Sequence, residues 1–198
     1  MNTEILDDKD FKGEELKKTY PTLGARFIAS ILDVLIITVP IGLLSLANIV
    51  YLQSTLIACL LMLVFPFYKV YMEGTYGYTI GKKLQGFKII KEGTENEEMD
   101  MKTSMLRYIF GFLVLLFSFI ATFYTFQIIT EGGWESFENF AEKSAAAQLT
   151  VPAFLSAITN LINLVYFVAI LFIFQGGKRQ TLYDRIAKTV CVVNTDND

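Results

Sequence analysis

Two charged residues, Arg26 and Asp33, lie at the start of the first long apolar stretch of the chain. They are seven residues apart, so on an α-helix they share one face and are separated by roughly 10 Å along the axis. A charge deep in a bilayer costs about 2.5–3.5 kcal/mol on insertion scales, so Asp33 needs a partner or carries a proton. Its candidate partners are Arg26, Arg107, Arg179 and Arg185.

Two interpretations of Asp33 stay open. In the first, Asp33 and Asp184 form an ionic clamp with the arginines and tie the helix ends together. In the second, Asp33 binds a proton or a cation, as acids inside membranes commonly do. Asn160 and Asn163 are polar residues inside another apolar stretch, where we expect them to form hydrogen bonds between helices.

Several other kinds of chemistry are not expected. The chain has no histidine, and its two cysteines, Cys59 and Cys191, do not have the spacing of a metal site. The glycines of segment 77–83 do not match a phosphate-binding loop, because Lys83 stands where a Ser or Thr is required. We therefore expect no enzymatic activity, no metal, no cofactor and no nucleic-acid partner.

The elements that position these residues follow from hydropathy. Of the 198 residues 53% are hydrophobic and 19% are charged, and the apolar residues come in blocks with the charges between them. Each of four blocks is long enough to cross a bilayer as a helix: about 23–50, 55–71, 108–129 and 151–174. The sequence predicts an all-α membrane protein with four transmembrane helices in one domain, 20–194, between tails 1–19 and 195–198.

The basic residues predict the orientation of these helices. All but one of the 17 Lys and Arg residues lie in the N-terminal segment, the middle connection or the C-terminal segment, and the exception is Lys143. By the positive-inside rule both termini are cytoplasmic, in a cell (inner) membrane. Lys82, Lys83 and Lys88 of the middle connection are expected to meet anionic lipid headgroups.

Two connections have patterns of their own. Segments 84–91 and 187–194 are short and β-prone, and we expect them to pair at the cytoplasmic side. The outer segment 133–147 has the pattern of an amphipathic helix at the membrane interface, with Trp134 and Phe137 as aromatic anchors. The alternative for this segment is a lid over a pore or a site for a partner.

Three segments together resemble the RDD family of integral membrane proteins, which is named for one arginine and two aspartates. Segment 20–33 (YPTLGARFIASILD) is similar to the family's opening, with Arg26 and Asp33 in the named positions. Segment 79–90 (TIGKKLQGFKII) resembles its cytoplasmic T-x-G-K segment, which here contains Thr79, Gly81, Lys82 and Gly86. Segment 179–193 (RQTLYDRIAKTVCVV) resembles its closing segment, where Asp184 is the second aspartate.

For function, the resemblance implies transport, including cation/proton exchange, which has been suggested for this family. Tyr183 stands where the family often has His, and Lys188 stands where it often has Gly. One hypothesis is a small transporter or cation/proton exchanger that uses Asp33 and works as a homo-oligomer. The alternative is a non-catalytic membrane module that binds or regulates another envelope protein.

Overall fold

The structure is a computed structural model that describes residues 19–93, 99–175 and 177–193. The predicted tails, 1–19 and 195–198, lie outside the described residues apart from Thr19. The elements are α1 Leu23–Asp33, π-helix η1 Val34–Thr38, α2 Val39–Ala47, π-helix η2 Asn48–Leu52, α3 Thr55–Tyr76, α4 Ile80–Leu84, β1 Phe87–Lys91, α5 Met101–Arg107, α6 Ile109–Gly132, α7 Phe137–Thr150, α8 Ala153–Leu171, 3-10 helix η3 Phe172–Phe174, α9 Leu182–Ile186 and β2 Thr189–Val193.

Among the described residues, four helical stretches are long and apolar enough to cross a membrane, as the sequence predicts. They are Leu23–Leu52, Thr55–Tyr76, Ile109–Thr130 and Ala153–Phe174. Large apolar side chains along them are exposed, among them Leu56 at 68% and Phe67 at 62%. A soluble protein would bury such side chains, whereas here they form the surface that meets lipid. The four-helix membrane fold is therefore confirmed.

The first span is one long helix whose geometry changes directly after Asp33. The π-helix Val34–Thr38 precedes Pro40, which lies in the first turn of α2. In a regular α-helix the ring of Pro40 would clash with the carbonyl group four residues earlier, at Ile36. Widening of this turn relieves the clash, and it leaves Asp33 as the last residue of α1.

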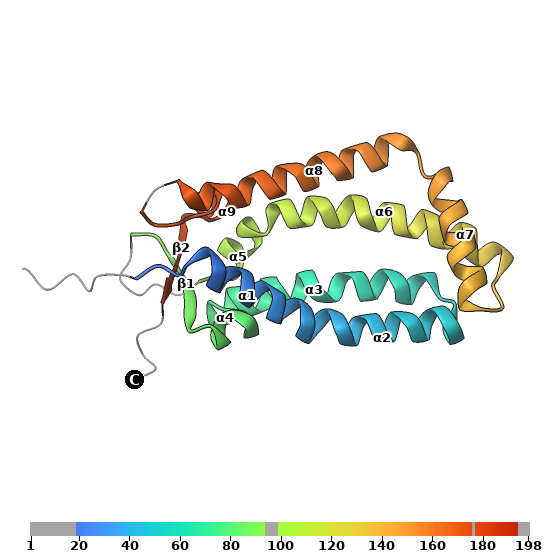
Figure 1. Cartoon of the computed structure of the whole chain (residues 1–198), viewed down its shortest axis with the longest axis horizontal. Helices are drawn as coiled ribbons and strands as arrows, with labels where there is room; N and C mark the ends of the chain where they lie inside the picture. Colours follow the sequence, from blue (N-terminus) through green and yellow to red (C-terminus); the bar gives the residue numbers. More distant parts are fainter. Residues whose placement is uncertain (1–18, 94–98, 176, 194–198) are drawn as a thin grey trace, which may run out of the picture.

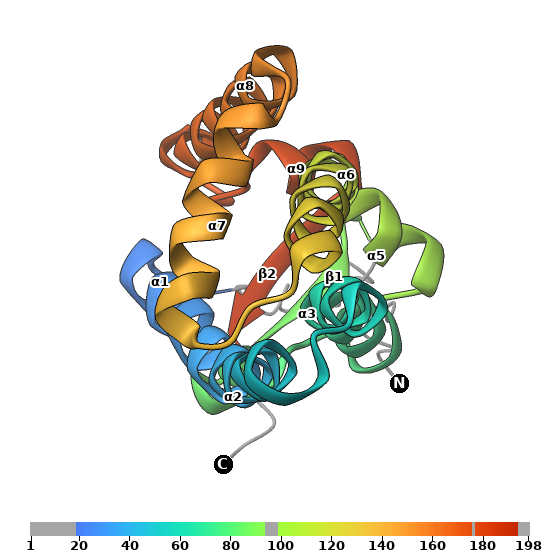
Figure 2. The same ribbon diagram turned by 90° about the vertical axis from the view of Figure 1, so that its right-hand side faces the viewer.

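The four spans pack as an open row rather than as a closed bundle. The first span packs on α3 through α2, α3 packs on α6, and α6 packs on α8. Figure 2 shows α8 standing apart from α1 and α2, with α7 crossing between them at one end of the molecule. One side of α8 is therefore left uncovered by the other spans.

The opposite end of the molecule, which we call the sheet end, holds β1 and β2 beside the starts or ends of the spans (Figure 1). The strands pair antiparallel, with Phe87 opposite Val193 and Lys91 opposite Thr189. The predicted pairing of segments 84–91 and 187–194 is confirmed. The inner face of this ladder packs Phe87, Ile89 and Cys191 against Ala29 of α1.

At the far end, a helix is present in the predicted segment 133–147, although α7 spans Phe137–Thr150, but Trp134 does not have the expected role. Trp134 precedes α7 and is only 6% exposed, because it packs against Phe126 and Phe140. Its Nε1–H donates to the carbonyl oxygen of Ile49 at 2.6 Å. Trp134 thus fastens α7 to the first span instead of contacting lipid, whereas Phe137 is exposed as an interfacial residue would be.

The approach of α4 to α1 depends on the absence of a side chain at Gly81. A Cβ atom at this position would lie 2.0 Å from the carbonyl oxygen of Ala29. That overlap is with backbone, so it cannot be relieved by turning a side chain. Gly42, on the exposed face of α2, is the matched comparison, since a Cβ atom there would meet nothing within 4 Å.

We predict that Gly81→Ala forces α4 away from α1 and lowers the free energy of unfolding by about 1–3 kcal/mol or more. Gly42→Ala should be neutral or slightly stabilising, because alanine favours a helix by about 1 kcal/mol over glycine. Denaturation of both variants in detergent micelles, followed by circular dichroism, measures the difference. Equal stability of the two variants would contradict this description of the α1–α4 contact.

Candidate functional site

The arginine at the end of α5, Arg107, joins two buried carboxylates at the sheet end. Its Nε–H donates to Oδ1 of Asp184 on α9 at 2.7 Å, and its Nη1 forms a short ion pair with Glu73 of α3. Asp184 is 0% exposed and Glu73 is 6% exposed. One guanidinium therefore links three helices that are far apart in the sequence, with a geometry that only a forked donor provides.

Each of the two carboxylates has a second cation. Lys82 of α4 forms a short ion pair with Glu73, and Nη1 of Arg26 donates to Oδ2 of Asp184 at 3.4 Å. The Nε and Nη2 atoms of Arg26 are buried without a hydrogen-bond partner in the structure. Each carboxylate thus has two cationic partners, one of which is the shared Arg107. This part of the site therefore has the character of an ionic clamp.

Asp33 is surrounded by neutral hydrogen-bond donors. Its Oδ1 accepts hydrogen bonds from the Tyr68 hydroxyl at 2.9 Å and the Gly81 N–H at 2.8 Å, and its Oδ2 accepts from the Thr79 hydroxyl at 2.6 Å. Within the described part of the chain, these partners are neutral donors and none of the four candidate arginines is among them. Of the two interpretations that the sequence leaves open, the ion pair between Asp33 and an arginine is not formed among the described residues, although the side chain is buried at 1% exposure.

In the structure, Thr79, Gly81 and Lys82 of the T-x-G-K segment each make a distinct contact. The Thr79 hydroxyl caps α4 by accepting from the Lys82 N–H at 3.4 Å while it donates to Asp33. Gly81 allows the backbone to come close enough for its N–H to reach the Asp33 carboxylate. Lys82 turns toward Glu73 and is only 12% exposed at its side chain, so it does not serve the lipid headgroups as predicted.

Three other predicted site residues lie outside this cluster. Arg179 is exposed and donates to the Tyr20 carbonyl oxygen at 3.3 Å, and Arg185 is exposed and donates to the Gln175 carbonyl oxygen at 2.6 Å. Gly86 forms a turn with a φ of 68° between α4 and β1. The arginines therefore brace loops at the sheet end and do not neutralise either aspartate.

Sequence reasoning missed Glu73 and Tyr68. The second span was predicted to end at residue 71, whereas α3 continues to Tyr76 and carries Glu73 within its last turn. An acidic residue directly after an apolar stretch that already contains Lys69 was the available signal. Tyr68 carried no signal, because a tyrosine near the end of a span is common at membrane interfaces.

The residues that depart from the family pattern fit their surroundings. Lys188 has a φ of 52°, a conformation that glycine adopts without strain, which explains why glycine suits this position. Tyr183 stacks on Tyr166 with ring centroids 6.0 Å apart, and Arg107 lies over its ring. Burial, above all, raises the pKa of the Tyr183 phenol, so this residue stays neutral where a histidine would titrate.

Asp184 remains ionised despite its burial. Burial alone would raise the pKa of this carboxyl, but Arg107, the Thr181 hydroxyl and Arg26 together hold it below its ordinary value. Asp184 also accepts from the Thr181 N–H at 3.0 Å, while the Thr181 hydroxyl accepts from the Asp184 N–H, which forms a capping box at the start of α9. The second aspartate of the family motif is therefore a structural anion in this chain.

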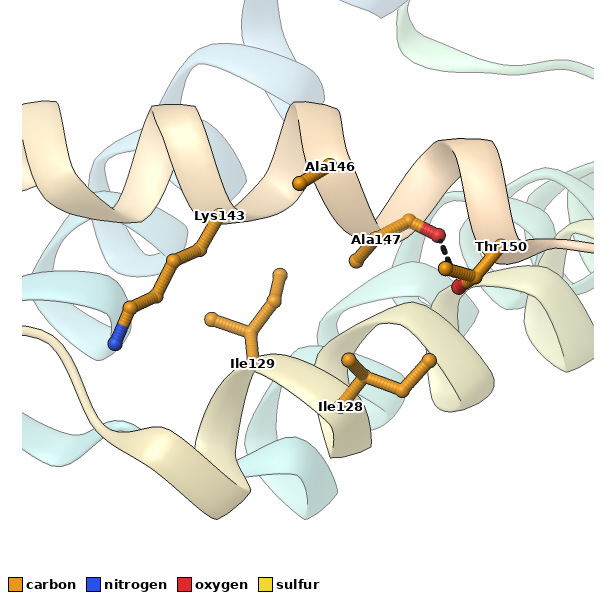
Figure 3. Close-up of a pocket in the computed structure, with 6 residues that line it drawn as sticks. All are labelled: Ile128, Ile129, Lys143, Ala146, Ala147 and Thr150. Atoms are coloured by element: carbon orange, nitrogen blue, oxygen red, sulfur yellow. Dashed lines mark hydrogen bonds between the residues drawn. The ribbon is translucent and has the colours of Figure 1, made fainter.

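Two cavities lie away from Asp33. One, of about 310 Å³, opens between α6 and α7 at the far end and is lined by Ile128, Ile129, Lys143, Ala146, Ala147 and Thr150 (Figure 3). The other, of about 210 Å³, lies at the sheet end beside Leu23 and Arg179. Neither cavity is lined by Asp33. The 1% exposure of Asp33 shows that its carboxylate is closed off from solvent in this conformation.

Asn160 and Asn163 also differ from expectation. Both lie on α8 and are exposed, and among the described residues neither side-chain amide has a hydrogen-bond partner. Thr159, beside them, bonds to the Leu155 carbonyl oxygen of its own helix at 2.9 Å. The predicted hydrogen bonds between helices are therefore not made by these asparagines within the chain.

The comparisons with known proteins bear on the whole transmembrane region. The family model of the RDD family matches residues 20–188, which include segments 20–33 and 79–90 and the first part of segment 179–193 with Asp184. No curated protein and no solved structure matches the chain.

We predict that Arg107→Met lowers the free energy of unfolding by about 3–5 kcal/mol, because it leaves two buried carboxylates with one cation fewer. Lys102→Met, on the exposed face of the same helix, should change it by less than about 0.5 kcal/mol. Unfolding in detergent micelles measures both. Similar stability of the two variants would show that Arg107 does not hold the helices together.

The lowered pKa of Asp184 gives stability a pH dependence with a definite sign. A carboxyl whose pKa is depressed by folding stabilises the protein above its unfolded pKa, about 3.9, and this contribution is lost as pH falls through the folded value. We predict a melting temperature that is level from about pH 8 to pH 5 and drops below about pH 4. Glu92→Gln, which removes a carboxylate that pairs with the exposed Lys178, should leave this drop in place. A level melting temperature down to about pH 3 would contradict the prediction.

Proposed function

This chain belongs to the RDD family of integral membrane proteins, and we propose that it is a small cation/proton exchanger whose coupling carboxylate is Asp33. One observation carries the proposal. Glu73 and Asp184 each have two cationic partners, whereas Asp33 is buried in a membrane span and is held by neutral donors. A buried carboxylate without a fixed counter-ion suits reversible binding of a proton or a cation.

The atoms around Asp33 suit a small hard cation. The carboxylate supplies two oxygen atoms, and the Tyr68 and Thr79 hydroxyls supply one each, both within hydrogen-bond distance of the carboxylate. A hydroxyl that donates to the carboxylate can rotate and offer its lone pairs to a cation instead. Because a proton and an alkali cation would compete for the same carboxylate, the site provides the coupling that exchange requires.

Access to this site requires α4 to move. Asp33 is closed off by Thr79 and Gly81, which lie on the short segment at the start of α4. The π-helix Val34–Thr38 begins at the next residue, and such segments are frequent at functional hinges. We infer that α4 separates from α1 on one side and that the π-helical segment adjusts on the other, so that Asp33 is exposed alternately.

The depth of Asp33 fits this role. Asp33 lies ten residues from the start of α1 and Tyr68 lies eight residues from the end of α3, which places them roughly 12–15 Å from the sheet end. The distribution of Lys and Arg supports a cytoplasmic sheet end and two cytoplasmic termini, in the cell (inner) membrane. Residues 20–194 then form the exchanging domain, without an enzymatic activity.

The test is ion flux in sealed proteoliposomes under an imposed pH gradient, with sodium, potassium and lithium added in turn. Wild type should dissipate the gradient, and Asp33→Asn should reduce the rate to that of empty liposomes, because an amide cannot bind and release a proton here. Asp100→Asn is the matched control, because Asp100 is the exposed N-cap of α5 and asparagine caps a helix equally well.

Equal flux in Asp33→Asn and wild type would overturn the proposal. So would no flux from wild type that is shown to be folded and inserted. Either result would favour the alternative, a non-catalytic module that acts on another envelope protein.

A further inference from the structure

The strongest unexplained feature outside the Asp33 site is a polar stripe on the lipid-facing side of α8. Ser156, Asn160 and Asn163 follow one another at spacings of four and three residues, so they lie on one helix face. All are exposed. The span runs from Ala153 to Phe174, so Asn163 lies at its midpoint, where hydrocarbon offers no hydrogen bonds.

This face is not the one that α8 turns toward its neighbour. The less exposed positions Leu155, Ile162 and Ala169 recur every seven residues along another face. Asn160 and Asn163 are turned from Ile162 by roughly 100° or more, at about 100° per residue. Since α6 is the span against which α8 packs most, the polar stripe points away from the protein's own principal contact.

Small residues in and beside the stripe would let another helix come close. Ala153, Ser156 and Ala157 occupy adjoining exposed positions in the first half of α8. Faces of this kind allow two membrane helices to approach at the backbone, and asparagines on them associate through hydrogen bonds.

We propose that this face of α8 is an interface between two copies of the chain. Copies inserted with the same topology place Asn160 and Asn163 at the same depth, so each amide meets its own counterpart across a two-fold axis along the membrane normal. An amide both donates and accepts, so an asparagine pair satisfies itself, and no other partner needs to supply a complementary group.

Fluorescence energy transfer tests this interface. Donor-labelled and acceptor-labelled copies are reconstituted together at decreasing protein-to-lipid ratios. Wild type should show transfer above random collision, and Asn160→Leu/Asn163→Leu should raise the dissociation mole fraction about tenfold or more, from the loss of several hydrogen bonds of about 1 kcal/mol each. Thr159→Val is the matched control, because it removes a hydroxyl that is already satisfied within its own helix.

A covalent measurement tests the same interface independently. Asn160→Cys should form a disulfide-linked dimer under mild oxidation in the membrane, because symmetry brings the two copies of this position together. The endogenous Cys59 and Cys191 are both buried and serve as the background in the wild-type chain.

Three results would overturn the proposal. The first is transfer in the leucine double variant equal to that of wild type, and the second is wild type at the level of random collision. The third is a monomeric wild type together with a loss of ion flux in the leucine double variant, because the stripe would then line a permeation path. Asp33→Asn should leave energy transfer unchanged, so this proposal can fail or succeed separately from the exchange activity.

Discussion

The sheet end of the molecule depends on one guanidinium group. Arg107 satisfies Glu73 on α3 and Asp184 on α9, and each carboxylate is buried so completely that it could not remain ionised without a cation beside it. The Nη2 atom of Arg107 also lies 3.9 Å from the Cys191 sulfur in β2. The end of a spanning helix, the closing segment and the strand ladder thus converge on a single side chain.

This arrangement has a consequence for the neighbouring carboxylate. Because Glu73 pairs with Lys82, the start of α4 lies beside α1 in this conformation, and the hydroxyl of Thr79 and the N–H of Gly81 are brought to Asp33. The carboxylates of the clamp and the carboxylate that we propose as the exchanging group, which the sequence left as alternatives for the same residues, are therefore different residues. Glu73 and Asp184 have cationic partners and supply the frame, whereas Asp33 has neutral partners.

The parts of the structure that depend on local pattern could be predicted from the sequence. Hydropathy alone predicts the four spans, and the two short β-prone segments, 84–91 and 187–194, predict the strand pair. Side-chain partners could not be predicted, because the sequence offers the same candidate arginines to Asp33 and to Asp184. The packing of α4, which brings Thr79 and Gly81 to Asp33, determines which aspartate is paired with an arginine. The prediction that Trp134 is a lipid-facing anchor was wrong for a similar reason. An aromatic residue beside a span can face lipid or contact another helix, and Trp134 contacts Ile49.

The most direct test of the difference between the three carboxylates is their reaction with dicyclohexylcarbodiimide, an apolar reagent that modifies protonated carboxyl groups in membranes. Peptide mass spectrometry of the treated protein would locate the adduct. We expect modification at Asp33, slowed by sodium, with Glu73 and Asp184 unmodified because their ion pairs keep them charged. Modification of Glu73 or Asp184 with none at Asp33 would contradict the assignment of Asp33 as the exchanging group.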